Sequence, residues 1–436
     1  MKKIPPVKYM RDFYPELMRQ RLEIESAWRA VSERAGFEPW DAPIVEHLDL
    51  FTRKSGEEIV TQLYTLTDRG DRELAIRPEM TPSLARLITQ RQSALPRPIK
   101  WYCSARMCRY ERGQRGRLRE FWQWNIDLLG VADVTADAEV MSVALDGLEE
   151  FGLGPADVAL RLNSRDLLAA LLGALGIPEE HHAAVYAVTD KRGKVPDETL
   201  TKLYEELGLD KATLEKLLAV MSCSTLEELD RAARGAGLVG FEAEVEKLQR
   251  LIGYLEALGK GDYVVFDIGI VRGLAYYTGP VFEIFDRNAE LRAICGGGRY
   301  DRLMETMGGQ PMPAVGFGMG DVVLGELLTE KGLWGTAPAN VVAQAVPLAD
   351  ERIADAMRLV ASLRAGGMMA DYVMKSGGLG KVLKRAGESG VRWVIFVGGD
   401  EWDSGQVRVK ELATGEERLV GTDGKELLAL IAKTAL

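Results

Sequence analysis

The stretch RMCRYERGQRGRLREFWQWNIDLL, residues 106–129, decides how this chain is interpreted. Residues 106–120 hold six arginines against two acidic residues, with Gly113 and Gly116 in the middle. Residues 120–129 then alternate aromatic and polar side chains, the pattern of a strand with one face toward a pocket. The stretch predicts two strands joined by a glycine-containing loop. Arginine binds phosphate through a planar fork, so the loop could bind a nucleotide, a nucleic-acid backbone or both. The alternative is an ordinary solvated hairpin.

The loop is basic although the whole chain is acidic. Its 436 residues include 55 basic and 65 acidic side chains, for a net charge of −10, so any nucleic-acid contact must come from a local basic patch. The composition, 47% apolar and 28% charged, is that of a globular protein, and the length predicts two to four domains. Four scattered cysteines and three histidines predict neither a disulfide framework nor a metal site. With no apolar leader and no run of about 18 apolar residues, we expect a soluble, cytoplasmic protein without membrane contact.

Sequence patterns divide the rest of the chain into regions. Residues 15–35 predict an amphipathic helix that ends at Gly36, and turn-rich, strand-like sequence follows. Residues 164–260 are rich in Leu, Ala and Glu at helical spacing, which predicts a helical insertion. Beyond it, we expect strands at 263–271, 281–285 and 292–294, a linker at 336–339, strands at 340–346, 392–397 and 406–412, and helices at 351–365 and 425–434. This order predicts one domain over residues 1–335 and an α/β domain over residues 338–436.

Two pairs of polar side chains precede the insertion. In RPEMTP, residues 77–82, Glu79 and Thr81 lie two residues apart. In an extended segment both would point the same way and could hold an ammonium group, whereas in a helix start Thr81 would be a cap. On the strand that follows the arginine loop, Gln123 and Asp127 share one face.

Three glycine-containing segments follow the insertion. RGLAYYTG, residues 272–279, places an arginine and two tyrosines after an apolar strand, which suits either a phosphate beside a polar ligand or ordinary packing. CGGGRYD, residues 295–301, and GFGMGD, residues 316–321, match neither a P-loop nor a Rossmann motif. Glycine in a strand lets a ligand approach closely, but turns or bulges explain these two segments equally well.

Taken in order, these segments resemble the class II aminoacyl-tRNA synthetases, and among them the histidyl-tRNA synthetase family, over almost the whole chain. Residues 109–123 resemble motif 2, and residues 36–46 resemble the class II dimer-interface motif. Residues 272–279 and 296–301 resemble two stretches that mark the histidine-specific family. The resemblance implies an α+β fold: an antiparallel-sheet class II catalytic domain with a helical insertion, plus a C-terminal α/β anticodon-binding domain.

The resemblance also implies an activity and its residues. The expected enzyme is a homodimeric ligase that joins L-histidine to tRNA(His) through a histidyl-adenylate, with ATP and Mg²⁺ and no other cofactor. Catalysis would rest on Arg109 and Arg272, because in-line attack at phosphorus needs positioned positive charge. By position in the family motifs, ATP would be bound by Arg109, Glu111 and Arg272, histidine by Glu79, Thr81, Gln123, Asp127, Tyr276, Tyr277 and Tyr300, and the tRNA acceptor end by Gln114 and Arg119.

Four positions depart from the family pattern. Val323 stands where most class II enzymes have the motif 3 arginine that packs against the adenine of ATP. Ala275 replaces an aspartate, Gly113 a proline and Met10 a threonine. Losing the motif 3 arginine would cost about 3 kcal/mol if no other group replaces it.

Two alternatives to this enzyme stay open at the level of sequence. One is the histidine-sensing regulatory paralogue that partners ATP phosphoribosyltransferase, which Val323 favours and which needs neither an anticodon module nor an arginine-rich loop. The other is a synthetase for proline, threonine or glycine, which the tyrosine-containing segments at 276–277 and 299–301 argue against.

Overall fold

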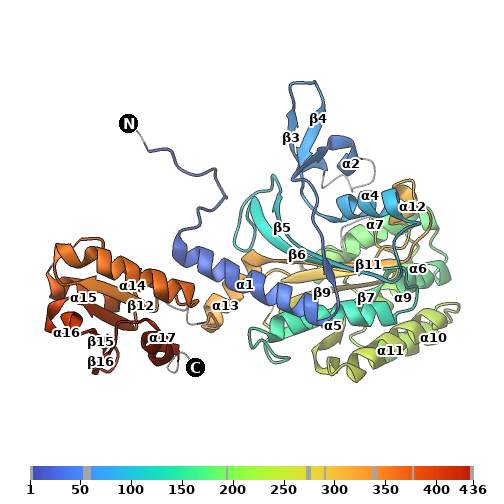
Figure 1. Cartoon of the computed structure of the whole chain (residues 1–436). Helices are drawn as coiled ribbons and strands as arrows, with labels where there is room; N and C mark the ends of the chain where they lie inside the picture. Colours follow the sequence, from blue (N-terminus) through green and yellow to red (C-terminus); the bar gives the residue numbers. More distant parts are fainter. Residues whose placement is uncertain are drawn as a thin grey trace. The chain divides into compact units, whose positions relative to one another are not determined.

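The computed structural model describes residues 3–52, 60–192, 195–271, 276–288, 291–335, 341–375 and 378–432. The chain forms two compact units, Met1–Gly335 and Thr336–Leu436 (Figure 1). The predicted linker at 336–339 and Arg272 to Ala275 lie outside the described residues.

The first unit is built on an eight-stranded sheet with the order β1-β5-β6-β11-β10-β9-β7-β8. Neighbouring strands from β5 to β7 run antiparallel, and the outer pairs β1–β5 and β7–β8 are parallel. The predicted antiparallel sheet is therefore confirmed for its six central strands. The strands are β1 Glu38–Pro39, β5 Ile99–Cys108, β6 Glu120–Leu129, β7 Val158–Ser164, β8 Val264–Phe266, β9 Pro280–Asp286, β10 Cys295–Arg299 and β11 Ala314–Gly320.

Two helices cover one face of this sheet, α1 (Pro15–Arg34) and α5 (Thr135–Glu149) (Figure 1). The even-numbered residues Trp122, Trp124, Ile126 and Leu128 of β6 pack into the same buried cluster as these helices. Trp124 stacks on Trp28 with ring centroids 5.9 Å apart, and its Nε1 donates to Ser32 Oγ at 2.9 Å. Since strand side chains alternate between faces, the odd-numbered residues of β6 lie on the other face of the sheet.

The two glycine-rich segments lie in the centre of the sheet as strands β10 and β11. The turn-or-bulge interpretation was wrong for them, and so was the strand expected at 292–294, because β10 begins at Cys295. A Cβ atom at Gly297 would lie 2.4 Å from Gly316 O, so only glycine lets these strands pack this closely.

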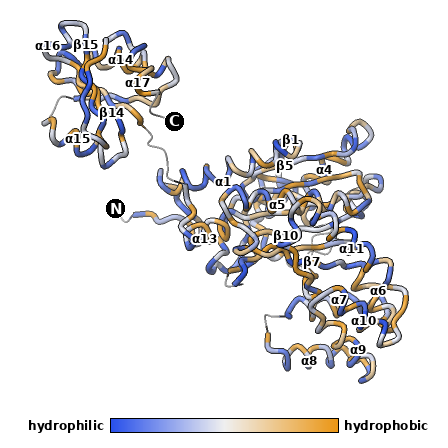
Figure 2. The backbone as a smooth tube through the Cα atoms, turned by 90° about the horizontal axis from the view of Figure 1, so that it is seen from below, coloured by the Kyte–Doolittle hydropathy of each residue, from blue (hydrophilic) through white to orange (hydrophobic). Residues whose placement is uncertain are grey.

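The insertion is helical, with α6 to α10 gathered at one end of the unit in both views (Figures 1 and 2). Its helices are α6 Arg165–Ala174, α7 Glu179–Thr189, α8 Asp197–Glu205, α9 Lys211–Met221, α10 Leu226–Gly235 and α11 Glu242–Ala257, followed by the 3₁₀ turn η1 Gly261–Tyr263. A large share of each helix joins the main core through leucines and valines at helical spacing.

A smaller sheet, of order β2-β4-β3, lies between β1 and β5 in the sequence. Its strands are β2 Val45–His47, β3 Tyr64–Thr67 and β4 Glu73–Ile76. Among the described residues of the unit, the remaining helices are α2 Leu48–Thr52, α4 Thr81–Arg91, α12 Leu303–Thr306 and α13 Asp321–Lys331. Helix α4 has Met80 as its N-cap, without a side-chain capping bond, and Thr81 is its first residue. The capping role considered for Thr81 was therefore wrong, because the helix begins at Thr81 itself and the N-cap position is Met80.

The second unit is an α/β module around a five-stranded sheet of order β13-β12-β14-β15-β16. Trp393 and Ile395 lie in its core. The strands are β12 Ala343–Pro347, β13 Ala370–Tyr372, β14 Trp393–Val397, β15 Gln406–Glu411 and β16 Glu417–Gly421, and the helices are η2 Asp350–Arg352, α14 Ile353–Ala365, α15 Leu379–Glu388, α16 Gly399–Asp403 and α17 Lys425–Ala432. In the described parts of both units, no helix combines the length and apolarity that a bilayer crossing requires.

Candidate active site

A cavity of about 200 Å³, here called the first cavity, lies over the odd-numbered face of β6. Its walls come from β6, β10 and β11, from the segment leading into α4, from the loop after β5 and from the tyrosine pair before β9. All seven side chains that the resemblance assigns to histidine line it: Glu79, Thr81, Gln123, Asp127, Tyr276, Tyr277 and Tyr300. Segments from both sides of the helical insertion therefore meet at one place.

Glycines form the floor of the first cavity. Gly316 of β11 pairs with Asp127 of β6, and Gly318 pairs with Asn125. A Cβ atom at Gly316 would lie 2.4 Å from Asp127 Oδ1, and one at Gly318 would lie 2.7 Å from Gln123 Nε2. The glycines thus leave the space that these polar side chains occupy above the sheet.

One end of the first cavity holds a buried carboxyl group and a buried phenol. Tyr300 Oη donates a hydrogen bond to Asp127 Oδ1, and the two residues are 2% and 5% exposed. Burial raises the pKa of Asp127 to about 7, against the opposing effect of the Tyr300 hydrogen bond. Burial, with the charge of Asp127, also raises the pKa of Tyr300 well above its usual range. A carboxylate and a hydroxyl together fit a ring that carries both N–H and bare nitrogen, as imidazole does.

A second buried carboxyl group, Glu79, lies on another wall. Glu79 is 3% exposed, and its Oε2 accepts a hydrogen bond from Tyr276 Oη at 3.2 Å. Its Oε1 is buried and has no hydrogen-bond partner in the described part of the chain. Burial raises the pKa of Glu79, while the nearby Arg109 and the bond from Tyr276 lower it. A buried acceptor without a partner is a site where a ligand N–H, such as an ammonium group, would bind.

Arg109 connects the first cavity to a second one. It follows β5 directly, and its Nε donates to Pro78 O at 2.9 Å, while its guanidinium carbon lies 5.4 Å from the Phe121 ring centroid. The second cavity has a volume of about 480 Å³ and shares Arg109, Glu111, Arg117, Gln123, Gly296 and Gly318 with the first. The shared walls make the two cavities neighbouring compartments, with Arg109 at their border.

The loop after Arg109 is a hairpin. Arg109 N donates to Arg119 O at 2.9 Å, and Gln114 N donates to Arg117 O at 3.1 Å. Gln114 is exposed at the tip. Arg119 is packed at the base, with its guanidinium carbon 4.1 Å from the Tyr110 ring centroid. Of the two residues expected to contact tRNA, Gln114 therefore lies on the surface of the loop, and Arg119 supports the loop at its base.

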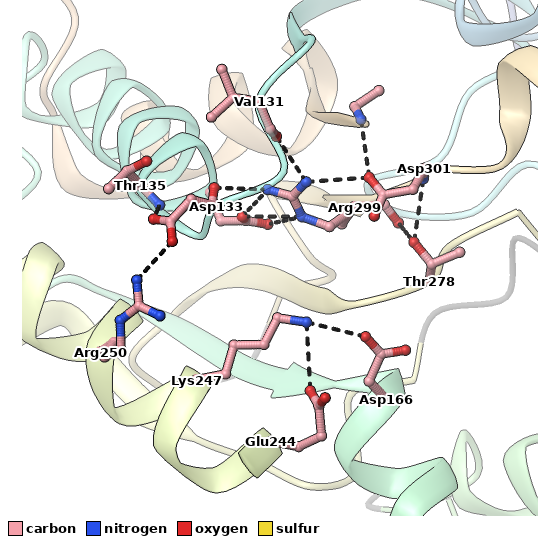
Figure 3. Close-up of polar contacts among 12 residues, drawn as sticks. Val131, Asp133, Thr135, Asp166, Glu244, Lys247, Arg250, Thr278, Arg299 and Asp301 are labelled. Atoms are coloured by element: carbon pink, nitrogen blue, oxygen red, sulfur yellow. Dashed lines mark hydrogen bonds and ion pairs between the residues drawn. The ribbon is translucent and has the colours of Figure 1, made fainter. Parts of the chain in front are cut away.

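Arg299 is the last residue of β10 and directly precedes Tyr300, and its bonds anchor this point of the chain (Figure 3). Its guanidinium forms an ion pair with Asp137 of α5, a carboxylate that is fully buried. It also donates to Val131 O at 3.0 Å and Asp133 O at 3.2 Å. These bonds reach to α5 and the turn before it, while the next side chain, Tyr300, lines the first cavity.

Sequence reasoning missed several lining residues, including Gln62, Asn125 and Arg117. Asn125 lies in phase between Gln123 and Asp127, so the strand period could have found it. Gln62 reaches the cavity through tertiary packing, which leaves no local signal. Arg117 pairs with the predicted nucleotide ligand Glu111 at 2.5 Å.

Arg272, to which the resemblance gives a catalytic role, lies outside the described residues. Glu111 lines both cavities. Among the described residues, no three His, Cys, Asp or Glu side chains gather closely enough to hold a metal ion by themselves.

Family models match both units. A model described as histidyl-tRNA synthetase matches residues 9–320, and one described as anticodon binding domain matches residues 342–433. The chain is 42% identical over 414 residues to the chloroplastic/mitochondrial histidine–tRNA ligase of Arabidopsis thaliana, covering 95% of this chain and 84% of that protein. It is 41% identical over 412 residues to the histidine–tRNA ligase of Opitutus terrae, covering 93% of each.

Solved structures show the same fold. The histidyl-tRNA synthetase of Nostoc matches with a TM-score of 0.85 at 25% identity, over 99% of this chain and 100% of that one. A Bacillus halodurans protein described as an ATP phosphoribosyltransferase regulatory subunit/histidyl-tRNA synthetase matches with a TM-score of 0.73 over 92% of this chain and 100% of that one. Its identity is 22%, so this likeness concerns the fold alone.

Proposed function

The chain belongs to the histidyl-tRNA synthetase family, and from this premise we propose that its two joined cavities bind histidine and ATP side by side. As a histidine–tRNA ligase, it activates L-histidine with ATP and transfers the histidyl group to tRNA(His). The observation that carries the assignment of the site is the shared border at Arg109, which lets one guanidinium contact both substrates.

The polar groups of the first cavity match the three polar parts of histidine. The unpartnered Oε1 of Glu79 would accept from the ammonium group, together with Thr81 and Gln123. Asp127 and Tyr300 would bind the imidazole, with Tyr276 and Tyr277 completing the wall. An amino acid without a ring N–H would give the buried Asp127 no donor beyond Tyr300, and such a loss discriminates strongly.

The chemistry of the first step needs charge more than proton transfer. A carboxylate oxygen of histidine attacks the α-phosphorus of ATP, the bond from that phosphorus to the bridging oxygen breaks, and pyrophosphate leaves with its electron pair. Arg109 would hold the reacting carboxylate and the α-phosphate in line, and Arg272 would stabilise the negative charge that grows on the phosphate. In the second step, a terminal ribose hydroxyl of tRNA attacks the carbonyl carbon and the bond from that carbon to the phosphate oxygen breaks. AMP leaves with the electron pair, and the hydroxyl proton passes to the phosphate or to solvent.

ATP would enter the second cavity with Mg²⁺. Glu111 and Glu283 both line that cavity. Mg²⁺ is typically held by one or two carboxylates together with substrate phosphates, so this donor set fits the ion. The ion would neutralise phosphate charge during attack.

The hairpin loop and the second unit would receive tRNA. Gln114 is exposed at the loop tip, where an acceptor end could contact it, and Arg119 would hold the base of the loop in place. The second unit matches an anticodon-binding family model, which supports a role for it at the anticodon.

The enzyme would act as a homodimer in the cytoplasm. Apolar side chains stand exposed near the small sheet, with Ile44 at 56%, Val45 at 40% and Leu66 at 40%. Exposed apolar side chains gathered in one region support a protein interface. The Ile44→Asp variant should sediment as a monomer, whereas an unchanged dimer would place the interface elsewhere. All four cysteines are free and buried, which supports a reducing compartment.

ATP–pyrophosphate exchange with each of the twenty amino acids tests the proposal. We expect exchange with histidine and background rates with the other nineteen. Exchange with another amino acid would refute the assignment of the first cavity, and tight histidine binding without exchange would favour the regulatory paralogue.

A further inference from the structure

The second cavity has an arginine on its wall that no family motif assigns. Arg292 lies in the segment between β9 and β10 and lines the cavity together with Phe121, Phe285 and Val323. It is exposed. Within the described ranges, it has no hydrogen-bond, ion-pair or aromatic partner.

The backbone around Arg292 is fixed on both sides. Leu291 N donates to Asp286 Oδ1 at 3.0 Å, and Ile294 N donates to Ile284 O at 2.8 Å. Leu291 and Ile294 are 7% and 2% exposed. The segment is therefore pinned to the sheet next to Arg292, so the start of its side chain is held in place beside the cavity.

Other arginines around the second cavity are already engaged. Arg117 pairs with Glu111 at 2.5 Å, and Arg109 is bound through its Nε to Pro78 O. Arg292 differs from them because its guanidinium is uncommitted among the described residues. A planar cation of this kind packs well on an aromatic ring.

Arg292 also lies in the same corner as Val323. A Cβ atom placed on Gly116 would meet Val323 Cγ2 at 3.2 Å and Arg292 Cγ and Cδ at 4.0 Å each. Both side chains therefore approach one point of the loop, Val323 from helix α13 and Arg292 from the β9–β10 segment. The side chain of an arginine at position 323 would therefore begin close to the side chain of Arg292.

We propose that Arg292 packs against the purine ring of ATP and so replaces the arginine that is absent at position 323. Phe121 also lines the second cavity and would give the purine ring an aromatic partner. The inference rests on the proposed function, because it takes ATP as the occupant of the second cavity. The required guanidinium would then come from the β9–β10 segment instead of from α13.

The test compares four variants in histidine-dependent ATP–pyrophosphate exchange. Arg292→Ala should raise the KM for ATP about ten- to thirtyfold, the range of a desolvated cation–π contact, with an unchanged KM for histidine and an unchanged melting temperature. The KM for ATP of Arg292→Lys should lie between those of the wild type and Arg292→Ala. The control is Arg231→Ala, an exposed arginine of α10 without a described partner, which should match the wild type. Adding Val323→Arg to Arg292→Ala should restore much of the ATP affinity.

The outcomes separate the inference from the proposed function. A wild-type KM for ATP in Arg292→Ala, or an equal rise in both KM values, would overturn the role of Arg292. If adding Val323→Arg to Arg292→Ala did not restore the affinity for ATP, the claim that Arg292 replaces the arginine absent at position 323 would be overturned. Absence of histidine-dependent exchange in the wild type would instead refute the proposed function. In that case, calorimetric titration with ATP alone would still decide whether Arg292→Ala weakens nucleotide binding.

Discussion

Replacing Gly318 by alanine should weaken histidine binding without unfolding the protein. The new Cβ atom would lie 2.7 Å from Gln123 Nε2 and 2.8 Å from Gln123 Cδ. Both atoms belong to the far end of a flexible side chain, so the amide group of Gln123 would move and the strands would stay. Gln123 would then lose the bond to the ammonium group of histidine that we propose for it.

The size of the effect follows from that single bond. A hydrogen bond to a charged group contributes about 1.5–3 kcal/mol. Its loss corresponds to a KM for histidine raised roughly ten- to hundredfold. The KM should be measured by ATP–pyrophosphate exchange at saturating ATP, and thermal unfolding should be followed in parallel.

Gly320 provides the matched control on the same strand. A Cβ atom there meets nothing within 4 Å, so Gly320→Ala should leave the KM for histidine unchanged. The reasoning would be refuted if Gly318→Ala kept the wild-type KM for histidine, or if both variants lost affinity equally.

Three further predictions concern other parts of the site. In its proposed role, Asp127 must be ionised to accept an imidazole N–H, and burial raises its pKa to about 7. The kcat/KM for histidine should therefore fall as the pH drops from 8 to 6. The Asp127→Asn variant should lose this pH dependence, and a wild-type pH profile in the variant would contradict the assignment. Arg299→Ala leaves Asp137 buried and unpaired, which should lower the free energy of unfolding by about 3–5 kcal/mol in urea titrations; a change below 1 kcal/mol would show that the pair is not structural. Gln114→Ala should spare exchange and slow transfer to tRNA, whereas equal losses in both steps would argue against acceptor-end contact.

Elements with a clear local period could be predicted from sequence. The alternation in residues 120–129 matches β6, and the helical spacing over residues 164–260 matches the run of helices α6 to α11. The glycine strands β10 and β11 could not be found in this way, because glycine has no side chain to show a period. Their strand conformation is set by pairing with neighbours far away in the sequence.

The site was predictable only in part from the residues themselves. The strand period joins Gln123 to Asp127, but no spacing connects them to Glu79 or Tyr300, which reach the first cavity through the packing of the sheet. The residue pattern singled out Glu79 as a possible ammonium ligand, and the family resemblance supplied Tyr300 and assigned both residues to one site. It gave no indication of Arg292, since the position lies outside its motifs and is meaningful only beside Val323.

The central claim is that one border residue joins an imidazole-binding cavity to a nucleotide-binding cavity. A crystal structure with a non-hydrolysable histidyl-adenylate analogue tests it most directly. We predict imidazole nitrogens within about 3.2 Å of Asp127 and Tyr300, Arg109 on the phosphate, and the purine in the second cavity. An analogue bound elsewhere, or with its imidazole away from Asp127, would contradict the account.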